Sequence, residues 1–361
     1  LVHMSLDALL QRGLDEQVFP LARLEVFHEG RHALSLGNAS PGCQFDLASV
    51  TKVMSTTALL LDLKIPLTAS VRRTFPAGAD VSLLDLAFHR SGLPAFKPYF
   101  ADALTENPRL LEAAEPALRA KVRRSIFERV IATPVERPVG ASAVYSDLGF
   151  ILLGAVLEVS TGRPLDVLFR ERIAGPLKLT AGYRRLSSSL PRPGDFAPTG
   201  ATRPREPAPG QEGLWSVAEC PTKPAEVDDD NAWCLDGVSG HAGLFGTALD
   251  VARFGQAVLE GRFTPPSPWG PDGATPGSTR AFGFDTPSQE GASCGQRFGR
   301  AGPLGAIGHL GFTGTSLWID FDRKLVVAFL SNRVALGRAN IKIREFRPRV
   351  HDAVLDALQL K

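Results

Sequence analysis

Ser49 and Lys52 form the pattern S-x-x-K, between a short apolar stretch (residues 45–48) and a long apolar helical pattern over residues 53–63. If a helix begins near Ser49, the hydroxyl and the ammonium lie on one helical face, in the positive field of the helix N-terminus. A serine is a poor nucleophile until a base takes its proton, and a lysine with a lowered pKa can be that base. The pattern therefore indicates nucleophilic catalysis. The alternative is an ordinary helix start with a solvated lysine.

Further segments turn this short motif into an ordered set. Tyr145 and Asp147 lie just before an apolar helical pattern, and a glycine-rich segment, 308–315, lies between two predicted strands. Two more segments, 89–94 and 240–248, flank them. In this order and spacing, the set resembles the serine β-lactamase and penicillin-binding protein superfamily. More narrowly, it resembles the branch of class C β-lactamases, D-alanyl-D-alanine carboxypeptidases and esterases, over nearly the whole chain.

The resemblance implies a role for each residue of the set. Ser49 would attack a carbonyl carbon and become acylated, Lys52 would take or relay its proton, and Tyr145 would serve the leaving group and the hydrolytic water. The backbone N–H groups of Ser49 and Phe312 would form the oxyanion hole. Gly311 would keep the strand free of side-chain bulk, so that a substrate can lie against it. Whether Lys52 or Tyr145 is the dominant base stays open.

Two residues depart from the usual pattern of this branch. Asp147 stands where asparagine is usual, and an ionised aspartate accepts hydrogen bonds but donates none. It could hold Lys52 charged, which would shift the base role towards Tyr145, or cap the helix that begins at residue 148; the two are compatible. His309 replaces a lysine and carries a positive charge only when protonated. We therefore expect small esters or D-amino-acid peptides to be turned over ahead of β-lactams.

Other chemical patterns in the chain are weaker. Ser293 lies in a G-x-S-x-G match that lacks the strand before it and the helix after it, so it is assigned to a loop. The acidic run 228–230 is interpreted as a solvated turn, because no other carboxylates show the spacing of a calcium loop. His241 is expected to organise a turn beside the cleft. Trp215 and Trp233 either line a pocket or pack in the core.

Composition excludes several classes of protein. Of the 361 residues, 44% are apolar and 22% are charged, which suits a packed core and disfavours disorder. A net charge of +2 gives no electrostatic reason to expect nucleic acid, and no apolar run is long enough to span a bilayer. The four cysteines form neither a disulfide framework nor a metal-ligand pattern, so free thiols are expected. A bridge between Cys220 and Cys234 stays open.

The order of the predicted elements indicates an α+β fold of the β-lactamase-like kind. Strand patterns lie near both ends of the chain and helical patterns lie between them, which predicts one antiparallel sheet flanked by helices. We expect residues 5–55 and 235–361 to form the sheet domain. Residues 56–234 would form an inserted, mainly helical domain with a Pro/Gly-rich surface loop or lid near 190–224. The predicted strands span residues 21–28, 32–36, 306–309, 316–320 and 325–331.

The expected function is that of a serine hydrolase without metal or cofactor, acting through an acyl-enzyme on a small-molecule or peptide substrate. A cytoplasmic location is expected, because the start of the chain lacks the pattern of a secretory signal. The alternative is a catalytically weak penicillin-binding or sensor module that kept the fold. Intact Ser49, Lys52 and Tyr145 favour the enzyme. The sequence leaves the physiological substrate and the oligomeric state open.

Overall fold

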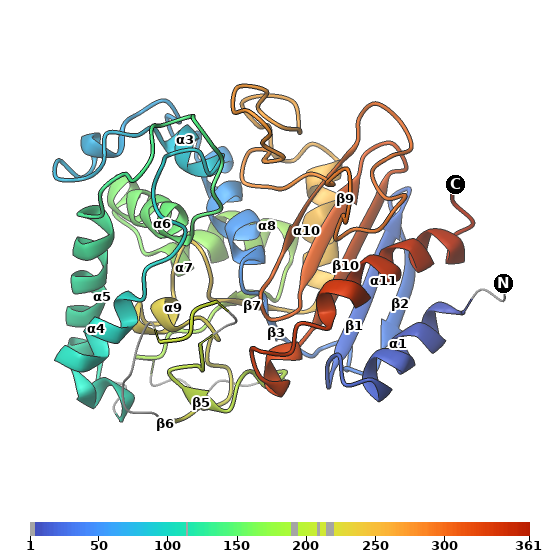
Figure 1. Ribbon diagram of the computed structural model, residues 1–361, viewed down its shortest axis with the longest axis horizontal. Helices are drawn as coiled ribbons and strands as arrows, with labels where there is room; N and C mark the ends of the chain where they lie inside the picture. Colours follow the sequence, from blue (N-terminus) through green and yellow to red (C-terminus); the bar gives the residue numbers. More distant parts are fainter. Residues whose placement is uncertain (1–3, 113–114, 189–193, 208–209, 214–219) are drawn as a thin grey trace.

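A five-stranded antiparallel sheet brings the two ends of the chain together (Figure 1). The structure is a computed structural model that describes residues 4–112, 115–188, 194–207, 210–213 and 220–361. The strands lie in the order β2–β1–β10–β9–β8, so the first hairpin pairs with a strand from the last third of the chain. Their bounds are β1 Ala22–His28, β2 Arg31–Gly37, β8 Ala306–Leu310, β9 Ser316–Asp320 and β10 Leu325–Ser331.

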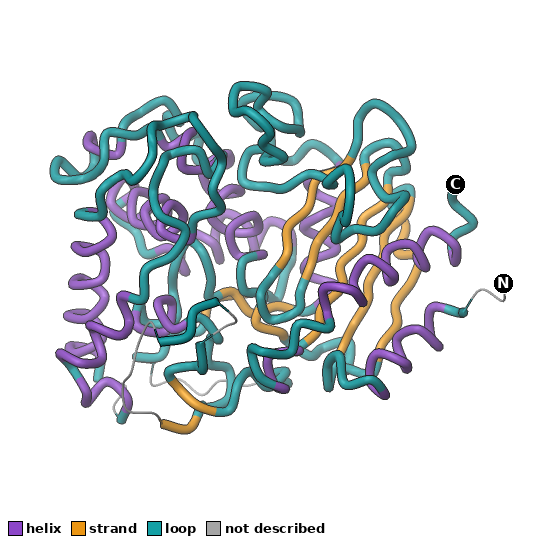
Figure 2. The backbone as a smooth tube through the Cα atoms, viewed as in Figure 1, coloured by secondary structure: helices purple, strands orange, loops and turns teal. Residues whose placement is uncertain are grey.

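The sheet has an apolar layer on each face, because successive side chains of a strand point to opposite sides. In β10, Val326, Ala328 and Leu330 join the core that continues into the helical region, whereas Leu325, Val327 and Phe329 join the core on the other face. Helix α10 (Ala248–Leu259) packs on the first face, and α1 (Leu6–Asp15) and α11 (Ile343–Ala357) lie on the second (Figure 2). The result is three layers, helix, sheet and helix.

The middle of the chain is mainly helical and lies beside the sheet (Figure 1). Its α-helices are α2 Ala58–Asp62, α3 Leu83–Ala87, α4 Tyr99–Glu106, α5 Pro116–Ile131, α6 Asp147–Thr161, α7 Leu165–Phe169, α8 Gly175–Leu177 and α9 Asp230–Cys234. Other helical turns span Lys52–Thr57, Val71–Arg73, Pro108–Leu111, Arg170–Ala174 and Arg333–Leu336. Two small sheets pair β3 (Phe45–Asp46), β7 (Leu244–Gly246) and β4 (Gly182–Tyr183), and β5 (Thr202–Arg203) with β6 (Cys220–Pro221).

Helix α6 is the central helix of this region, with every residue from Leu148 to Leu157 buried. Gly154 lets another segment approach it closely, since a Cβ there would lie 2.9 Å from the Cα of Gly240. This contact brings residues 240–244 against the helix and beside the site described below. No single helix in the described ranges has the length and apolar character to cross a bilayer; only the bent pair of Asp147–Thr161 with Leu165–Leu177 has both together.

The predicted α+β fold class is confirmed, and strands β9 and β10 have the predicted bounds. The division into a sheet domain and an inserted helical domain stays a prediction. All four cysteines are free thiols, so Cys220 and Cys234 form no bridge. Part of the predicted lid near 190–224 lies outside the described residues, and so does Trp215. Trp233 is buried in the core beneath the guanidinium of Arg119, which answers the question of its role.

Candidate active site

Ser49 lies between a tight turn and the start of a helix. The preceding Ala48 has a φ of 46°, in the left-handed region that non-glycine residues rarely adopt. The helix begins at Val50 and winds as a π-helix over Lys52–Thr57, a form that is uncommon and often found at functional sites. The predicted helix start near Ser49 is thus confirmed, while the π-helical winding has no signal in the sequence. The turn leaves Ser49 half-buried at the floor of a cleft.

Lys52 is fully buried and all three of its ammonium N–H groups have acceptors. Nζ lies 2.8 Å from Ser49 Oγ, 2.7 Å from Asp147 Oδ1 and 3.3 Å from the carbonyl oxygen of His241. The same nitrogen lies 4.7 Å from the centre of the Tyr145 ring. Three segments far apart in sequence therefore meet at one amine. Asp147 is the ion-pair partner of Lys52, as predicted.

The charges at this point favour an ammonium beside a neutral phenol. Burial lowers the pKa of Lys52, but Asp147 and then Tyr145 outweigh it, so the pKa lies above its ordinary value. Burial raises the pKa of Tyr145 and the charge of Lys52 only partly opposes it, so that pKa is also raised. Tyr145 Oη is buried without a well-oriented hydrogen bond. At rest, the site therefore holds neither a free amine nor a phenolate.

Residues 89–95 hold the segment that carries Tyr145 and Asp147. The backbone N–H of Ser146 donates to His89 Nδ1 at 3.0 Å, the Ser146 hydroxyl donates to the carbonyl of Pro94, and the N–H of Asp147 donates to the carbonyl of Ala95. Ser146, and not Asp147, caps helix α6, because its Oγ accepts from the N–H of Gly149. The interpretation of Asp147 as a helix cap is therefore wrong, which leaves its carboxylate for Lys52.

The segment after β8 docks on the turn that carries Ser49. The hydroxyls of Thr313 and Thr315 donate to the carbonyls of Asp46 and Leu47, at 2.7 and 3.0 Å. A Cβ on Gly311 would lie 2.7 Å from the Leu47 carbonyl oxygen, so this glycine permits contact with the nucleophile turn. The sequence-based reason for Gly311, room for substrate along the strand, stays a prediction.

Phe312 follows at the rim of the cleft with 40% of its surface exposed. Neither its N–H nor that of Ser49 donates to a group within the part of the chain that the structure describes. Both N–H groups are therefore without an acceptor among these residues, and their role as the oxyanion hole stays a prediction.

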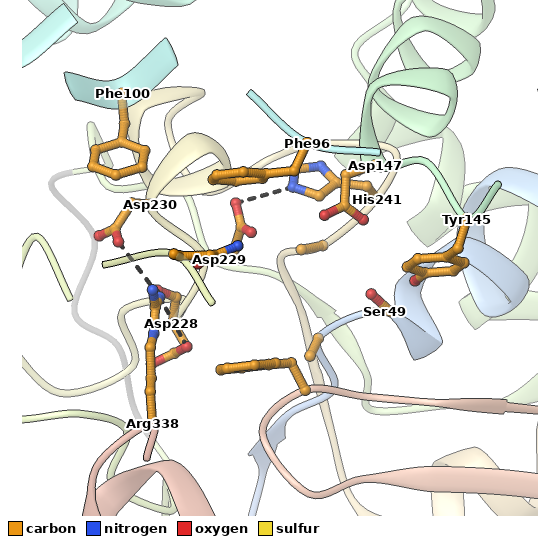
Figure 3. A pocket seen from close by; sticks show the side chains of 14 residues that line it. Ser49, Phe96, Phe100, Tyr145, Asp147, Asp228, Asp229, Asp230, His241 and Arg338 are labelled. Carbon is orange, nitrogen blue, oxygen red and sulfur yellow. Dashed lines mark hydrogen bonds and ion pairs between the residues drawn. The ribbon is translucent and has the colours of Figure 1, made fainter. Parts of the chain in front are cut away.

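One pocket beside Ser49 has a volume of about 160 Å³ and is rich in carboxylates (Figure 3). Asp229 Oδ1 lies 2.9 Å from His241 Nε2, and Asp228 and Asp230 pair with the buried Arg338. The prediction of a solvated acidic turn at 228–230 is wrong, because Asp228 and Asp230 are buried ion-pair partners of Arg338 and Asp229 shares a hydrogen bond with His241. His241 borders the cleft as predicted, and its ring and carbonyl both belong to the hydrogen-bond network of the site.

Three groups on this side could in principle hold a cation. Asp147, Asp229 and His241 each place one ligand atom within 4.8 Å of the others. However, Asp147 already accepts from the Lys52 ammonium, and Asp229 already shares a hydrogen bond with His241. The group is therefore explained as a hydrogen-bond network.

A second pocket of about 300 Å³ also borders Ser49 and Tyr145 and includes His309. His309 Nδ1 lies 2.8 Å from the carbonyl oxygen of Leu310, so Nδ1 donates and Nε2 is the unprotonated nitrogen. Burial, together with the charge of Lys52, lowers the pKa of His309 to about 3. His309 is therefore neutral near pH 7 and does not supply the positive charge of the lysine that it replaces.

The structure brings together the seven residues predicted for the site, and it separates the decoy. Ser293 lies in a loop, with neither a strand before it nor a helix after it. Sequence reasoning missed Arg280 and Arg347, which line the second pocket. Arg347 had one signal: it follows Phe346 and precedes Val350 on the apolar face of the last helix, where a cation is out of place.

Comparisons with known proteins give matches over most of the chain. Residues 6–347 match the family model described as Beta-lactamase. The N-acetylmuramyl-L-alanine amidase of Bacillus subtilis (strain 168) is 29% identical over 326 residues, 80% of this chain and 68% of that protein. The D-amino acid amidase of Ochrobactrum anthropi SV3 has a similar structure, with a TM-score of 0.64, 18% identity and 98% of each chain covered. The structure of EstCE1, described as a hydrolase with promiscuous acyltransferase activity, is also similar. Its TM-score is 0.61, its sequence identity is 21%, and the match covers 96% of this chain and 97% of that one.

Proposed function

The chain belongs to the beta-lactamase family, and from that premise we propose that it is a serine hydrolase that cleaves an ester or amide through an acyl-enzyme on Ser49. The observation that carries the proposal is the position of Lys52 Nζ, within hydrogen-bond distance of both Ser49 Oγ and Asp147 Oδ1. A buried amine between a hydroxyl and a carboxylate can relay a proton from one to the other.

In the first step, Ser49 Oγ bonds to the carbonyl carbon of the substrate. Lys52 passes one ammonium proton to Asp147 and takes the hydroxyl proton of Ser49, so the amine ends as it began and the carboxylate gains a proton. Substrate binding excludes water from the cleft, and desolvation favours the neutral amine and acid over the ion pair. The backbone N–H groups of Ser49 and Phe312 would receive the oxyanion.

In the second step, the tetrahedral intermediate collapses and the bond to the leaving oxygen or nitrogen breaks. Tyr145 is neutral at rest, so its hydroxyl can give a proton to the leaving group. Asp147 then gives its proton, through Lys52, back to the Tyr145 oxygen. Water then attacks the acyl-enzyme by the reverse of this route, which releases the acid and restores the Ser49 hydroxyl. The neutral state of His309 removes one fixed charge from the cleft, which supports small esters or D-amino-acid peptides ahead of β-lactams.

The test is a hydrolysis panel of p-nitrophenyl acetate and butyrate, nitrocefin and D-Ala-D-Ala peptides. Ser49→Ala is expected to abolish hydrolysis, and Ser293→Ala is the matched control that should retain it. Incubation with a fluorophosphonate or a fluorescent penicillin, followed by intact mass, should give one adduct on the wild type and none on Ser49→Ala. Full activity in Ser49→Ala would defeat the proposal. An adduct on Ser49 without turnover of any substrate would favour the penicillin-binding or sensor alternative.

A further inference from the structure

The second pocket beside Ser49 is lined by arginines that outnumber its carboxylates. Arg280, Arg333, Arg344 and Arg347 contribute to its wall, and Asp285 is its one acidic lining residue within the described part of the chain. Like charges gathered in a partly enclosed space raise the free energy of the empty pocket. The arrangement therefore needs an explanation from what each guanidinium contacts.

Arg347 is a buried guanidinium with no hydrogen-bond or ion-pair partner among the residues that the structure describes. It is 5% exposed, its Nε is buried without a hydrogen bond, and it makes no ion pair with any residue that the structure describes. Burial, followed by repulsion from Arg333, lowers the pKa of Arg347 to about 9. A buried cation without a counter-ion is costly, and buried charges in proteins are normally paired.

Two of the other arginines are engaged within the protein. Arg280 pairs with Asp285 at 3.2 Å, and Arg333 donates to the carbonyl oxygens of Phe312, Arg338 and Asn340. Arg333 thus uses its guanidinium N–H groups to hold the backbone at Phe312, and these are not free for a ligand. Neither of them neutralises the charge of Arg347.

Arg344 lies one helical turn before Arg347, so both project from the same side of α11. Figure 1 shows that the first turns of this helix lie toward the middle of the molecule, where the sheet meets the helical region. Cations are unfavourable at a helix N-terminus, where the backbone dipole is positive. Helix dipole and arginines act together here, and together they attract an anion.

The residues that share the pocket with Arg347 indicate which anion would bind there. Ser49 and Tyr145 line the same cavity, and so does His309, whose Nε2 is buried without a partner. A group bound against Arg347 therefore shares a cavity with the nucleophile and with the residue proposed to protonate the leaving group. An anion held there belongs to the substrate.

We propose that this pocket binds the leaving group of the substrate, and that Arg347 and Arg344 select leaving groups that carry two carboxylates over those with one or none. The inference rests on the proposed function, because it names the substrate class of the same site. Arg344 and Arg347 lie on one side of a helix, and neither pairs with a carboxylate in the described part of the chain. Two such guanidinium groups match two negative charges better than one.

The experiment compares three acetate esters that differ in leaving-group charge: phenyl acetate, 3-acetoxybenzoate and 5-acetoxyisophthalate. We expect kcat/KM to rise along this series, by about tenfold or more from the neutral to the dianionic ester, mainly through KM. The preference should shrink in 0.5 M NaCl. Arg347→Met should remove most of this preference. Arg349→Met, which removes an exposed charge from the same helix outside the pocket, is the matched control.

A binding measurement separates this inference from the proposed function. Isophthalate and benzoate are titrated into the wild type and Arg347→Met by calorimetry, with no turnover required. Isophthalate should bind the wild type more tightly than benzoate, and Arg347→Met should lose that difference. Equal binding of both anions, or an unchanged preference in Arg347→Met, overturns the inference even if every ester is hydrolysed. Selective binding of isophthalate without hydrolysis of any ester would support the pocket and contradict the proposed function.

Discussion

The two pockets beside Ser49 differ in how their charges are balanced. Ser49, Tyr145 and Phe312 line both of them, so the two meet at the same reacting centre. On the carboxylate side, the acidic groups have partners within the protein, such as Arg338 for Asp228. On the arginine side, Arg347 is buried with none that the structure describes.

This difference is expected if the carboxylate side is a preformed structure and the arginine side is a binding site for a ligand. A buried charge with a protein partner holds the fold together, and its removal leaves the partner unpaired. A buried charge without a partner works against the fold and is retained only if a bound molecule completes it. Replacing arginine by methionine on each side should therefore change stability in opposite directions.

The largest effect is expected for Arg338→Met on the carboxylate side. Arg338 Nη2 donates to Asp228 at 3.2 Å and to Asp230 at 3.4 Å, and both carboxylates are buried. Loss of the guanidinium leaves them undercompensated, so the free energy of unfolding should fall by roughly 3–5 kcal/mol. Urea denaturation at pH 7 measures this. A loss below about 1 kcal/mol would mean that this side is not held by its ion pairs.

The same variant should also change the response to acid. Burial raises the pKa of Asp228, but Arg338 and then Arg205 and Arg203 outweigh it, so the pKa is lowered in the folded protein. A lowered carboxyl pKa contributes stability above the unfolded pKa of about 4, and this is lost as the pH falls. Without Arg338, the loss of stability on going from pH 7 towards acid should be smaller than in the wild type. Denaturation series at several pH values compare the two slopes.

The next effect concerns Asp147, which lines the carboxylate-rich pocket and accepts a hydrogen bond from the Lys52 ammonium. Asp147→Asn removes the charge that holds the pKa of Lys52 above its ordinary value, so burial should dominate and lower it. The relay also loses its proton acceptor, and kcat/KM for p-nitrophenyl acetate at pH 7 should fall roughly 100-fold. Part of the rate should return towards pH 9, as the amine of Lys52 loses its proton. Asp285→Asn is the control, and an unchanged rate and pH profile in Asp147→Asn would rule out the relay.

The contrast between the pockets also marks what the sequence can predict. Ser49, Lys52 and Tyr145 are recognisable because their spacing reflects short local contacts and an ordered set of motifs. The strands are recognisable because β9 and β10 are apolar runs bounded by turns. The prediction for the carboxylate run 228–230 is wrong because its ion-pair partners have no local signal in the sequence. Arg203 and Arg205 lie more than 20 residues away, and Arg338 lies more than 100 residues away.

Local geometry explains the other misreadings. Asp147 and Ser146 are both common helix caps, and only the hydrogen bond from Gly149 decides between them. The charge state of His309 depends on burial and on the neighbouring Lys52, which the sequence places 257 positions away. Arg347 lies on the apolar face of the last helix, but only its burial in the structure shows that its charge is enclosed. Tertiary burial, rather than residue type, made these differences.

A smaller effect is expected for Arg347→Met on the arginine side. The substitution removes a buried cation without a partner and its repulsion with Arg333, while methionine keeps an apolar stem of similar length. The free energy of unfolding in the absence of ligand should stay unchanged or rise by about 1 kcal/mol. Denaturation under the conditions used for Arg338→Met makes the two values comparable. A loss similar to that of Arg338→Met would reveal a protein partner for Arg347 and remove the reason to assign it a ligand.

The smallest expected effect is an absence of pH dependence in anion binding, and it tests which residue supplies the charge. If His309 were the cation with its ordinary pKa near 6.5, isophthalate affinity would fall as the pH rises from 5.5 to 7.5. With its pKa lowered to about 3, His309 is already neutral throughout this range, and Arg347, at about 9, stays protonated. Affinity measured by calorimetry should therefore stay constant within about twofold between these pH values. A tenfold loss of isophthalate affinity over this range that disappears in His309→Gln would show that His309, and not the arginines, binds the anion. The arginine side would then lose the role that distinguishes it from the other pocket.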